Sequence, residues 1–167
     1  MEMTHYMELL ASNQPWNLII YMAIPVILAE TIAITELYLL FTRNLNSKVK
    51  KLNKWCGIAA GIYFLGIFLF LFKTAVIPIT LGGEWRGFAD IIAVGFYLLG
   101  VVPLLGICLI ELGVLSKNKT EEEKLKSHAI FVAIFLVVAH VAMIFGMINP
   151  SVFSSNSSEM PAGMHQS

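Results

Sequence analysis

The sequence predicts an all-α integral membrane protein, a four-helix bundle, and two observations carry this prediction. Hydrophobic residues make up 57% of the 167 positions and charged residues 13%, with a mean hydropathy of +0.77. A soluble domain of this size cannot bury that much apolar surface. In addition, four apolar stretches reach or approach the ~20 residues that a helix needs to cross about 30 Å of hydrocarbon. They cover roughly residues 16–41, 55–72, 88–115 and 129–148.

The basic residues predict how these helices are oriented. Two connections, "TRNLNSKVKKLNK" at 42–54 and "SKNKTEEEKLKS" at 116–127, hold nine of the eleven Lys and Arg residues. An excess of Lys and Arg marks cytoplasmic loops. We therefore expect a plasma (inner) membrane protein with an N-out/C-out topology, both termini being external or periplasmic.

The chain is expected to form one domain with a tail. Residues 1–155 hold the four predicted spans, whereas 156–167 are rich in Ser, Gly and Pro and predict a flexible external tail. Thr120 and Glu123 match a capping box and predict the start of the last helix.

Prolines and glycines predict local features of the spans. Pro25 and Pro103 each free the carbonyl four residues earlier, at Tyr21 and Leu99, so we expect two kinks. The "GIAAG" pattern at 57–61 would let two helices approach closely.

Two apolar segments outside the spans are expected at the outer surface. Met3, Tyr6, Met7 and Leu10 have the spacing of a short amphipathic helix, which we expect to rest on the membrane surface. The connection 73–88 is apolar but broken by Pro and Gly, so we expect it to lie along the outer interface.

Ionisable residues inside spans are candidates for function, because each costs a few kcal/mol in hydrocarbon. Glu30 falls near mid-membrane, as a buried charge or proton partner. Glu36 lies seven residues before Arg43, and we expect the two to pair at the cytoplasmic boundary. Glu111 and His128 fall at the same boundary. Whether they form a site there with Glu36 is left open.

The segment "HAIFVAIFLVVAH" places a histidine at each end of eleven apolar residues. On a helix, His128 and His140 are then about 18 Å apart along the axis and about 120° apart around it, so they cannot share one ligand. Met143 and Met147 follow His140 on the same helix face, and Met22 in the first span falls at nearly the depth of Met143.

Imidazole and thioether groups together favour soft ions, Cu(I) above all. We therefore predict that the protein binds or handles copper at a buried site near its outer face, although methionines also fill apolar cores without any ligand. The residues expected to hold the metal are His140, Met143, Met147, Met22, His5, Met164 and His165.

Two alternatives remain. The first is a b-type haem protein for electron transfer, in which Gly95 and Gly100 make room for the ring. Because the first three spans contain no histidine, Met22 would have to act as the second axial ligand. The second is a non-catalytic small subunit of a larger membrane complex.

No catalytic motif is present. The expected partners are lipid and a second copy or a larger complex, with no nucleic acid.

Overall fold

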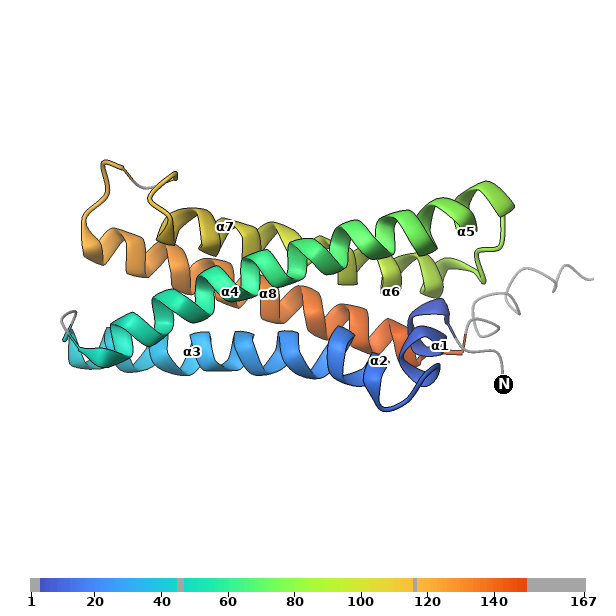
Figure 1. The fold of residues 1–167 in the computed structure, drawn as a ribbon, viewed down its shortest axis with the longest axis horizontal. Helices are drawn as coiled ribbons and strands as arrows, with labels where there is room; N and C mark the ends of the chain where they lie inside the picture. The colour runs from blue at the N-terminus through green and yellow to red at the C-terminus, as the bar shows by residue number, and fades with distance from the viewer. Residues whose placement is uncertain (1–3, 45–46, 116, 150–167) are drawn as a thin grey trace, which may run out of the picture.

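The computed structural model describes residues 4–44, 47–115 and 117–149, and this part of the chain is helical, with no strand. Four helices are long and apolar enough to cross a membrane: Trp16–Thr42, Lys48–Gly82, Phe88–Glu111 and Glu121–Met147. They lie side by side in an elongated bundle (Figure 1). The prediction of an all-α fold with four candidate spans is confirmed.

Several of these helices are divided into segments. The segments are α1 (His5–Ala11), α2 (Trp16–Leu18), the π-helical turn η1 (Ile19–Ala23), α3 (Ile24–Thr42), α4 (Lys48–Leu71), the π-helical turn η2 (Phe72–Val76), α5 (Ile77–Gly82), α6 (Phe88–Leu99), α7 (Val101–Glu111) and α8 (Glu121–Met147).

The expected interfacial connection at 73–88 is wrong for most of its length. Residues 72–82 form η2 and α5 and continue the second helix (Figure 1). Pro78 does not stop the helix: it is the second residue of α5, and the irregular π-helical turn η2 directly precedes that segment. The helix ends at Gly83, whose φ of 67° is left-handed.

Pro25 leaves the backbone carbonyl of Tyr21 without its helical partner, as predicted. Pro25 is the second residue of α3, which follows η1, and the freed carbonyl oxygen of Tyr21 accepts a hydrogen bond of 2.6 Å from the hydroxyl of Tyr97. The hydroxyl of Tyr63 donates to the carbonyl of Ile20 at 3.0 Å. Two side chains from other helices thus satisfy the backbone of the turn.

The second predicted interruption coincides with a helix break. α6 ends at Leu99, and Gly100 separates it from α7, which carries Pro103 in its first turn. The capping box at the start of α8 is also confirmed, since Thr120 and Glu123 bond to each other's backbone N–H groups.

The "GIAAG" pattern marks the close contact between α4 and α7. A Cβ on Gly57 would lie 2.9 Å from a side-chain carbon of Ile107, and one on Gly61 would lie 2.8 Å from the carbonyl oxygen of Leu104. The two helices can approach this closely only because both positions lack a side chain, so the predicted contact is real.

The N-terminal helix α1 differs from the expectation. Tyr6 and Leu10 form its apolar face, but they are buried at 7% and 4% exposure in the bundle. The rings of Tyr6 and Tyr97 are 5.0 Å apart, and the hydroxyl of Thr4 donates to the carbonyl of Gly146 at 2.8 Å. α1 therefore closes the end of the bundle rather than resting beside it, because its apolar face finds protein to cover.

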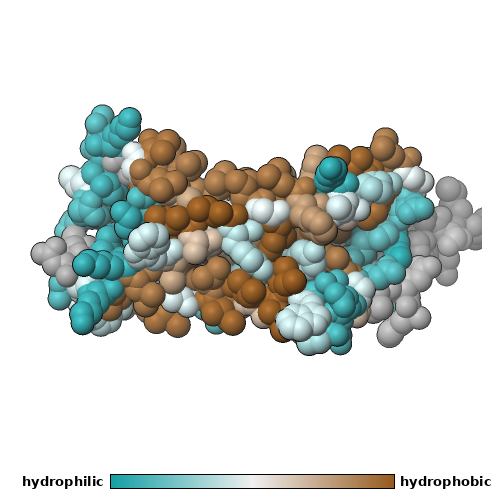
Figure 2. Space-filling model, viewed as in Figure 1, coloured by the Kyte–Doolittle hydropathy of each residue, from teal (hydrophilic) through white to brown (hydrophobic). Residues whose placement is uncertain are grey.

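The surface has the polarity of a protein that spans a membrane. Figure 2 shows a predominantly hydrophobic middle between two hydrophilic ends. Large hydrophobic side chains remain exposed in this middle, Ile34 and Val137 at 68% and 64% among them. Lipid would cover such a band, which fits a multi-pass membrane protein.

The close contact of α4 and α7 yields a stability prediction. In Gly61→Ala the new methyl group meets helix α7, and overpacking of this kind destabilises by roughly 1–3 kcal/mol. We expect the melting temperature of the detergent-solubilised protein to fall by several degrees. Gly66→Ala is the matched control, because Gly66 lies on the same helix with nothing within 4 Å. Equal melting temperatures for the two variants would contradict the assigned contact.

Candidate functional site

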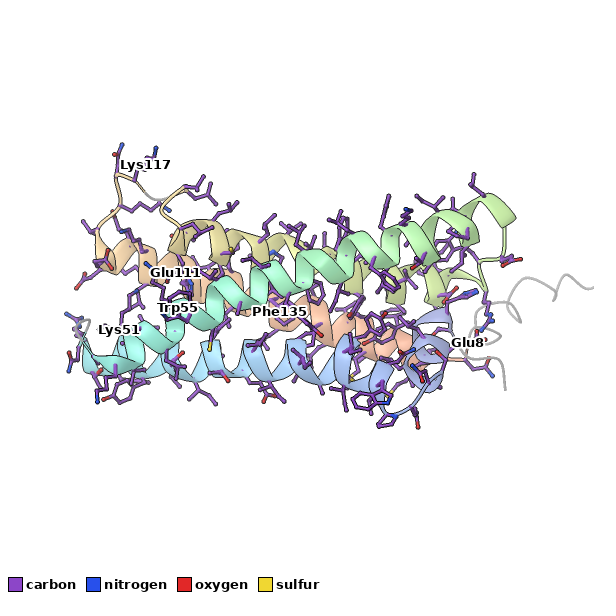
Figure 3. All side chains as sticks on the ribbon, in the orientation of Figure 1. Glu8, Lys51, Trp55, Glu111, Lys117 and Phe135 are labelled. Atoms are coloured by element: carbon purple, nitrogen blue, oxygen red, sulfur yellow. The ribbon has the colours of Figure 1, made fainter. Side chains whose placement is uncertain are left out.

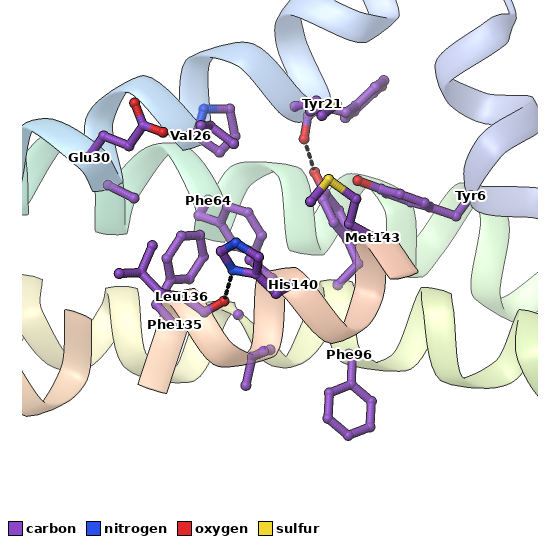
Figure 4. Close-up of a pocket in the computed structure, with 17 residues that line it drawn as sticks. Tyr6, Tyr21, Val26, Glu30, Phe64, Phe96, Phe135, Leu136, His140 and Met143 are labelled. Atoms are coloured by element: carbon purple, nitrogen blue, oxygen red, sulfur yellow. Dashed lines mark hydrogen bonds between the residues drawn. The ribbon is translucent and has the colours of Figure 1, made fainter. Parts of the chain in front are cut away.

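A cavity of about 280 Å³ lies in the half of the bundle that α1 closes. Its walls are mainly aromatic and aliphatic side chains of α1, α3, α6 and α8 (Figure 4). Few polar groups reach it. The lining residues that can bond a ligand or an ion are Tyr6, Tyr21, Met22, Glu30, Tyr97, His140 and Met143.

His140 is exposed on α8 rather than buried as predicted, and its ring is held in one orientation. Its Nδ1 lies 2.6 Å from the carbonyl oxygen of Leu136, one turn earlier in α8 (Figure 4). A carbonyl can only accept, so Nδ1 carries the hydrogen and, in the neutral ring, Nε2 carries a free lone pair. Glu30 is exposed on α3, and the hydrogen bonds of the described residues include none between Glu30 and His140.

Tyr6 brings a hydroxyl group to the same cavity. Its hydroxyl points toward Met143 in Figure 4. Burial raises the pKa of Tyr6 to about 12, so the hydroxyl stays protonated and able to donate at neutral pH.

Four of the predicted site residues therefore line one cavity: Met22, Glu30, His140 and Met143. Met147, which was expected on the same helix face, is not among the lining residues and is 65% exposed. Met164 and His165 lie outside the described residues. Within the described part of the chain, no group of three or more His, Cys, Asp and Glu side chains is placed to hold a metal ion.

The remaining predicted ligand, His5, lies in a different cluster. Its Nδ1 is 2.6 Å from Oδ2 of Asp90, and its backbone N–H donates to Oδ1 of Asp90 at 2.7 Å. The backbone N–H of Arg86 also donates to this carboxylate at 3.3 Å, and the Arg86 guanidinium pairs with Glu8 at 2.5 Å. His5 fastens α1 to α6 and is not part of the cavity.

Sequence reasoning missed Asp90, which is fully buried in the first turn of α6. The available signal was a carboxylate two residues inside an apolar span. Its partner could not be identified, because His5 is 85 residues away in the chain.

A second polar cluster lies near the other end of the bundle. His128 is 2% exposed, and its Nδ1 is 2.8 Å from Oε2 of Glu36. Asn53 donates to the same carboxylate oxygen at 2.9 Å and to the hydroxyl of Thr35 at 2.9 Å. Glu36 is thus shared between α8 and α4 in the interior of the bundle.

The predicted pair of Glu36 with Arg43 is wrong. Glu36 is 2% exposed and lies on the buried face of α3, between Ile32 and Leu39, which are both 0% exposed. Arg43 is the C-cap of α3 with a φ of 51°, so the chain has left the helical path there, and its side chain is exposed.

Glu111 completes this second cluster from α7 (Figure 3). Its Oε1 lies 3.3 Å from Nε2 of His128 and 4.0 Å from Nζ of Lys50. Gly57 provides the room, since a Cβ there would lie 3.4 Å from Nε2 of His128. Glu36, Glu111 and His128, which the sequence left as separate boundary residues, therefore form one buried cluster.

Together these features define a multi-pass, all-helical membrane protein with a cavity in one half and a buried ionisable cluster in the other. The chain belongs to a family of unknown function, DUF6803, whose sequence profile matches residues 1–162. No curated protein and no solved structure matches it.

The buried Asp90 yields a prediction for the closed end of the bundle. In Asp90→Asn the side chain keeps its size but loses its charge, and its amide nitrogen faces N–H donors. Disturbing buried hydrogen bonds of this kind destabilises by roughly 1–3 kcal/mol. We expect a lower melting temperature for Asp90→Asn than for the wild type. The exposed Glu84 offers the control Glu84→Gln, and a similar decrease in both variants would argue against the Asp90 network.

Proposed function

We propose that this protein binds a soft transition-metal ion in the cavity near its outer face, with Cu(I) as the ion that the donors favour. The observation that supports the proposal is the convergence of His140 and Met143 from α8 with Met22 from η1 on one cavity. An imidazole and two thioethers form a soft donor set.

The orientation of His140 supports the same proposal. Histidines that bind metals usually donate their other ring N–H to a carbonyl or carboxylate, which fixes the tautomer and the ring. The bond from His140 to Leu136 has this form and leaves the lone pair of Nε2 for an ion. Glu30 lines the same cavity and would supply a negative charge close to the cation.

The haem alternative receives less support. The cavity of about 280 Å³ is smaller than the roughly 300–1,000 Å³ that is typical of sites for drug-sized ligands. Gly100 lines it, but Gly95 does not and has nothing within 4 Å of a Cβ. An ion fits this space more readily than a macrocycle. The other alternative is a non-catalytic subunit that packs against a second copy of the chain or within a larger complex. It predicts that no metal is bound.

The proposed topology is N-out/C-out in the plasma membrane. The two basic connections, which join α3 to α4 and α7 to α8, lie at the same end of the bundle in Figure 1. This arrangement supports a cytoplasmic position for that end. The cavity then lies in the outer half.

The metal proposal predicts different Cu(I) affinities for two matched methionine variants. Met143→Leu removes a thioether from the cavity, whereas Met147→Leu removes an exposed one from the next turn of the same helix. We expect Met143→Leu to weaken Cu(I) binding at least about tenfold, which corresponds to about 1.4 kcal/mol. Met147→Leu should bind as the wild type does. The measurement is competition of the purified protein with a chromophoric Cu(I) chelator.

His140→Ala should abolish this binding. Wild-type affinity in both His140→Ala and Met143→Leu would refute the metal site. A visible spectrum of the same preparation distinguishes haem, which absorbs strongly, from Cu(I), which is colourless. A haem spectrum lost in His140→Ala would favour the alternative.

The topology is tested with single cysteines. Ser158→Cys in the tail should react with a membrane-impermeant thiol reagent on intact cells, whereas Lys119→Cys should react only after the cells are opened. Native Cys56 and Cys108 are partly buried and buried, respectively, and are replaced by Ser and Ala in the parent protein. The reverse labelling pattern would invert the orientation and place the cavity in the cytoplasmic half.

A further inference from the structure

The cluster around His128 is a buried group of ionisable side chains with no part in the proposed metal site. His128 is 12 residues, or about 18 Å of helix, from His140. The side chains of Glu36, His128 and Glu111 are 3%, 2% and 8% exposed. Membrane proteins rarely keep ionisable groups in their interior without a function.

The hydrogen bonds assign one proton of the cluster. Oε2 of Glu36 accepts from Asn53 and lies 2.8 Å from Nδ1 of His128. With Glu36 as a carboxylate, Nδ1 must carry a hydrogen and donate it. The Nδ1 side of the ring is then satisfied.

The opposite side of the ring requires a second proton. Nε2 of His128 lies 3.3 Å from Oε1 of Glu111, yet it has no hydrogen bond in the observed geometry. A neutral ring with hydrogen on Nδ1 would direct a lone pair at an ionised carboxylate in a site with almost no water. A proton between them removes this repulsion, either as imidazolium facing carboxylate or as carboxylic acid facing imidazole.

We propose that His128 and Glu111 share a proton and, together with Glu36, form a buried proton-binding site. The proton comes from water at the basic end of the bundle and returns to it, with no other bond made or broken. One oxygen of Glu36, Oε1, is buried without a hydrogen-bond partner and offers a place for a further proton.

The charged neighbours favour a site that holds one negative charge. Lys50 on α4 lies 4.0 Å from Glu111 and 4.0 Å from Glu121, and Lys124 pairs with Glu121 at 2.7 Å. The uncharged Asn53 faces the site from α4, and α3 contributes Glu36. With the shared proton present, the net charge of the three site residues is −1 and Lys50 balances it.

A metal ion is a poorer occupant of this cluster. Glu36 and Glu111 face opposite nitrogens of one imidazole ring, so the two carboxylates cannot bind the same ion together with that ring. The described residues also contain no His, Cys, Asp and Glu group that could hold a metal.

Nitrogen NMR of the ¹⁵N-histidine-labelled protein in detergent tests the proposal. A bare lone pair, a hydrogen-bonded nitrogen and a protonated nitrogen have different ¹⁵N shifts, and His128→Gln assigns the signals by their loss. At about pH 5, near the lower end of the usual histidine titration range, Nε2 of His128 should be protonated or hydrogen-bonded. A bare lone pair on Nε2 at this pH would overturn the proposal.

Matched variants locate the partner. In Glu111→Gln the side-chain amide can donate a hydrogen bond to Nε2 of His128 at every pH. We therefore expect the ¹⁵N shift of this nitrogen to stay constant between about pH 5 and 8 in the variant, whether or not it changes with pH in the wild type. Glu121→Gln, in an exposed position at the same end, should retain the wild-type profile. If the Nε2 shift of His128 changes with pH in the wild type and changes in the same way in Glu111→Gln, Glu111 is not the partner of His128. If Glu111→Gln does not fold, the wild-type spectrum at about pH 5 still tests whether Nε2 of His128 is protonated or hydrogen-bonded.

Discussion

A polar group in hydrocarbon has no water to bond, and this constraint accounts for the polar contacts between the helices of this protein. The carbonyl of Tyr21 is freed by Pro25 and takes its hydrogen bond from Tyr97, a residue of another helix. The side-chain amide of Asn53 on α4 donates to Thr35 and to Glu36 on α3. The helices are therefore fixed to each other by a few polar contacts within a largely apolar interior.

The polar contacts are grouped in layers, and the layers differ in chemistry. Near the basic end, the imidazole of His128 lies between two carboxylates, one of which is 4.0 Å from Lys50. In the other half, the imidazole of His140 lies in a cavity with thioethers and aromatic rings. We propose that the first layer binds protons and that the second binds a soft metal ion. Because His128 and His140 belong to the same helix, α8 provides one side chain to each layer, about 18 Å apart.

Local patterns in the sequence predicted local features correctly. The capping box at Thr120 and the close contact at "GIAAG" need information from only a few neighbouring residues. Predictions about longer-range contacts were less reliable. Glu36 was assigned to Arg43, seven residues away, but its observed partner His128 is 92 residues away. α1 was placed on the membrane surface because its amphipathic pattern does not tell lipid from a protein partner.

The sequence by itself determined the all-helical class, the four apolar spans, and the similar depth of Met22 and Met143 near His140. Composition and helical periodicity depend on neighbouring residues, so they can be read from the chain directly. Only the tertiary structure decided that Met147 faces outward, that Asp90 holds α1, and that Glu36, His128 and Glu111 meet. These outcomes depend on how the helices are rotated and which of them are neighbours. That arrangement is set by packing over the whole bundle, which no local pattern encodes.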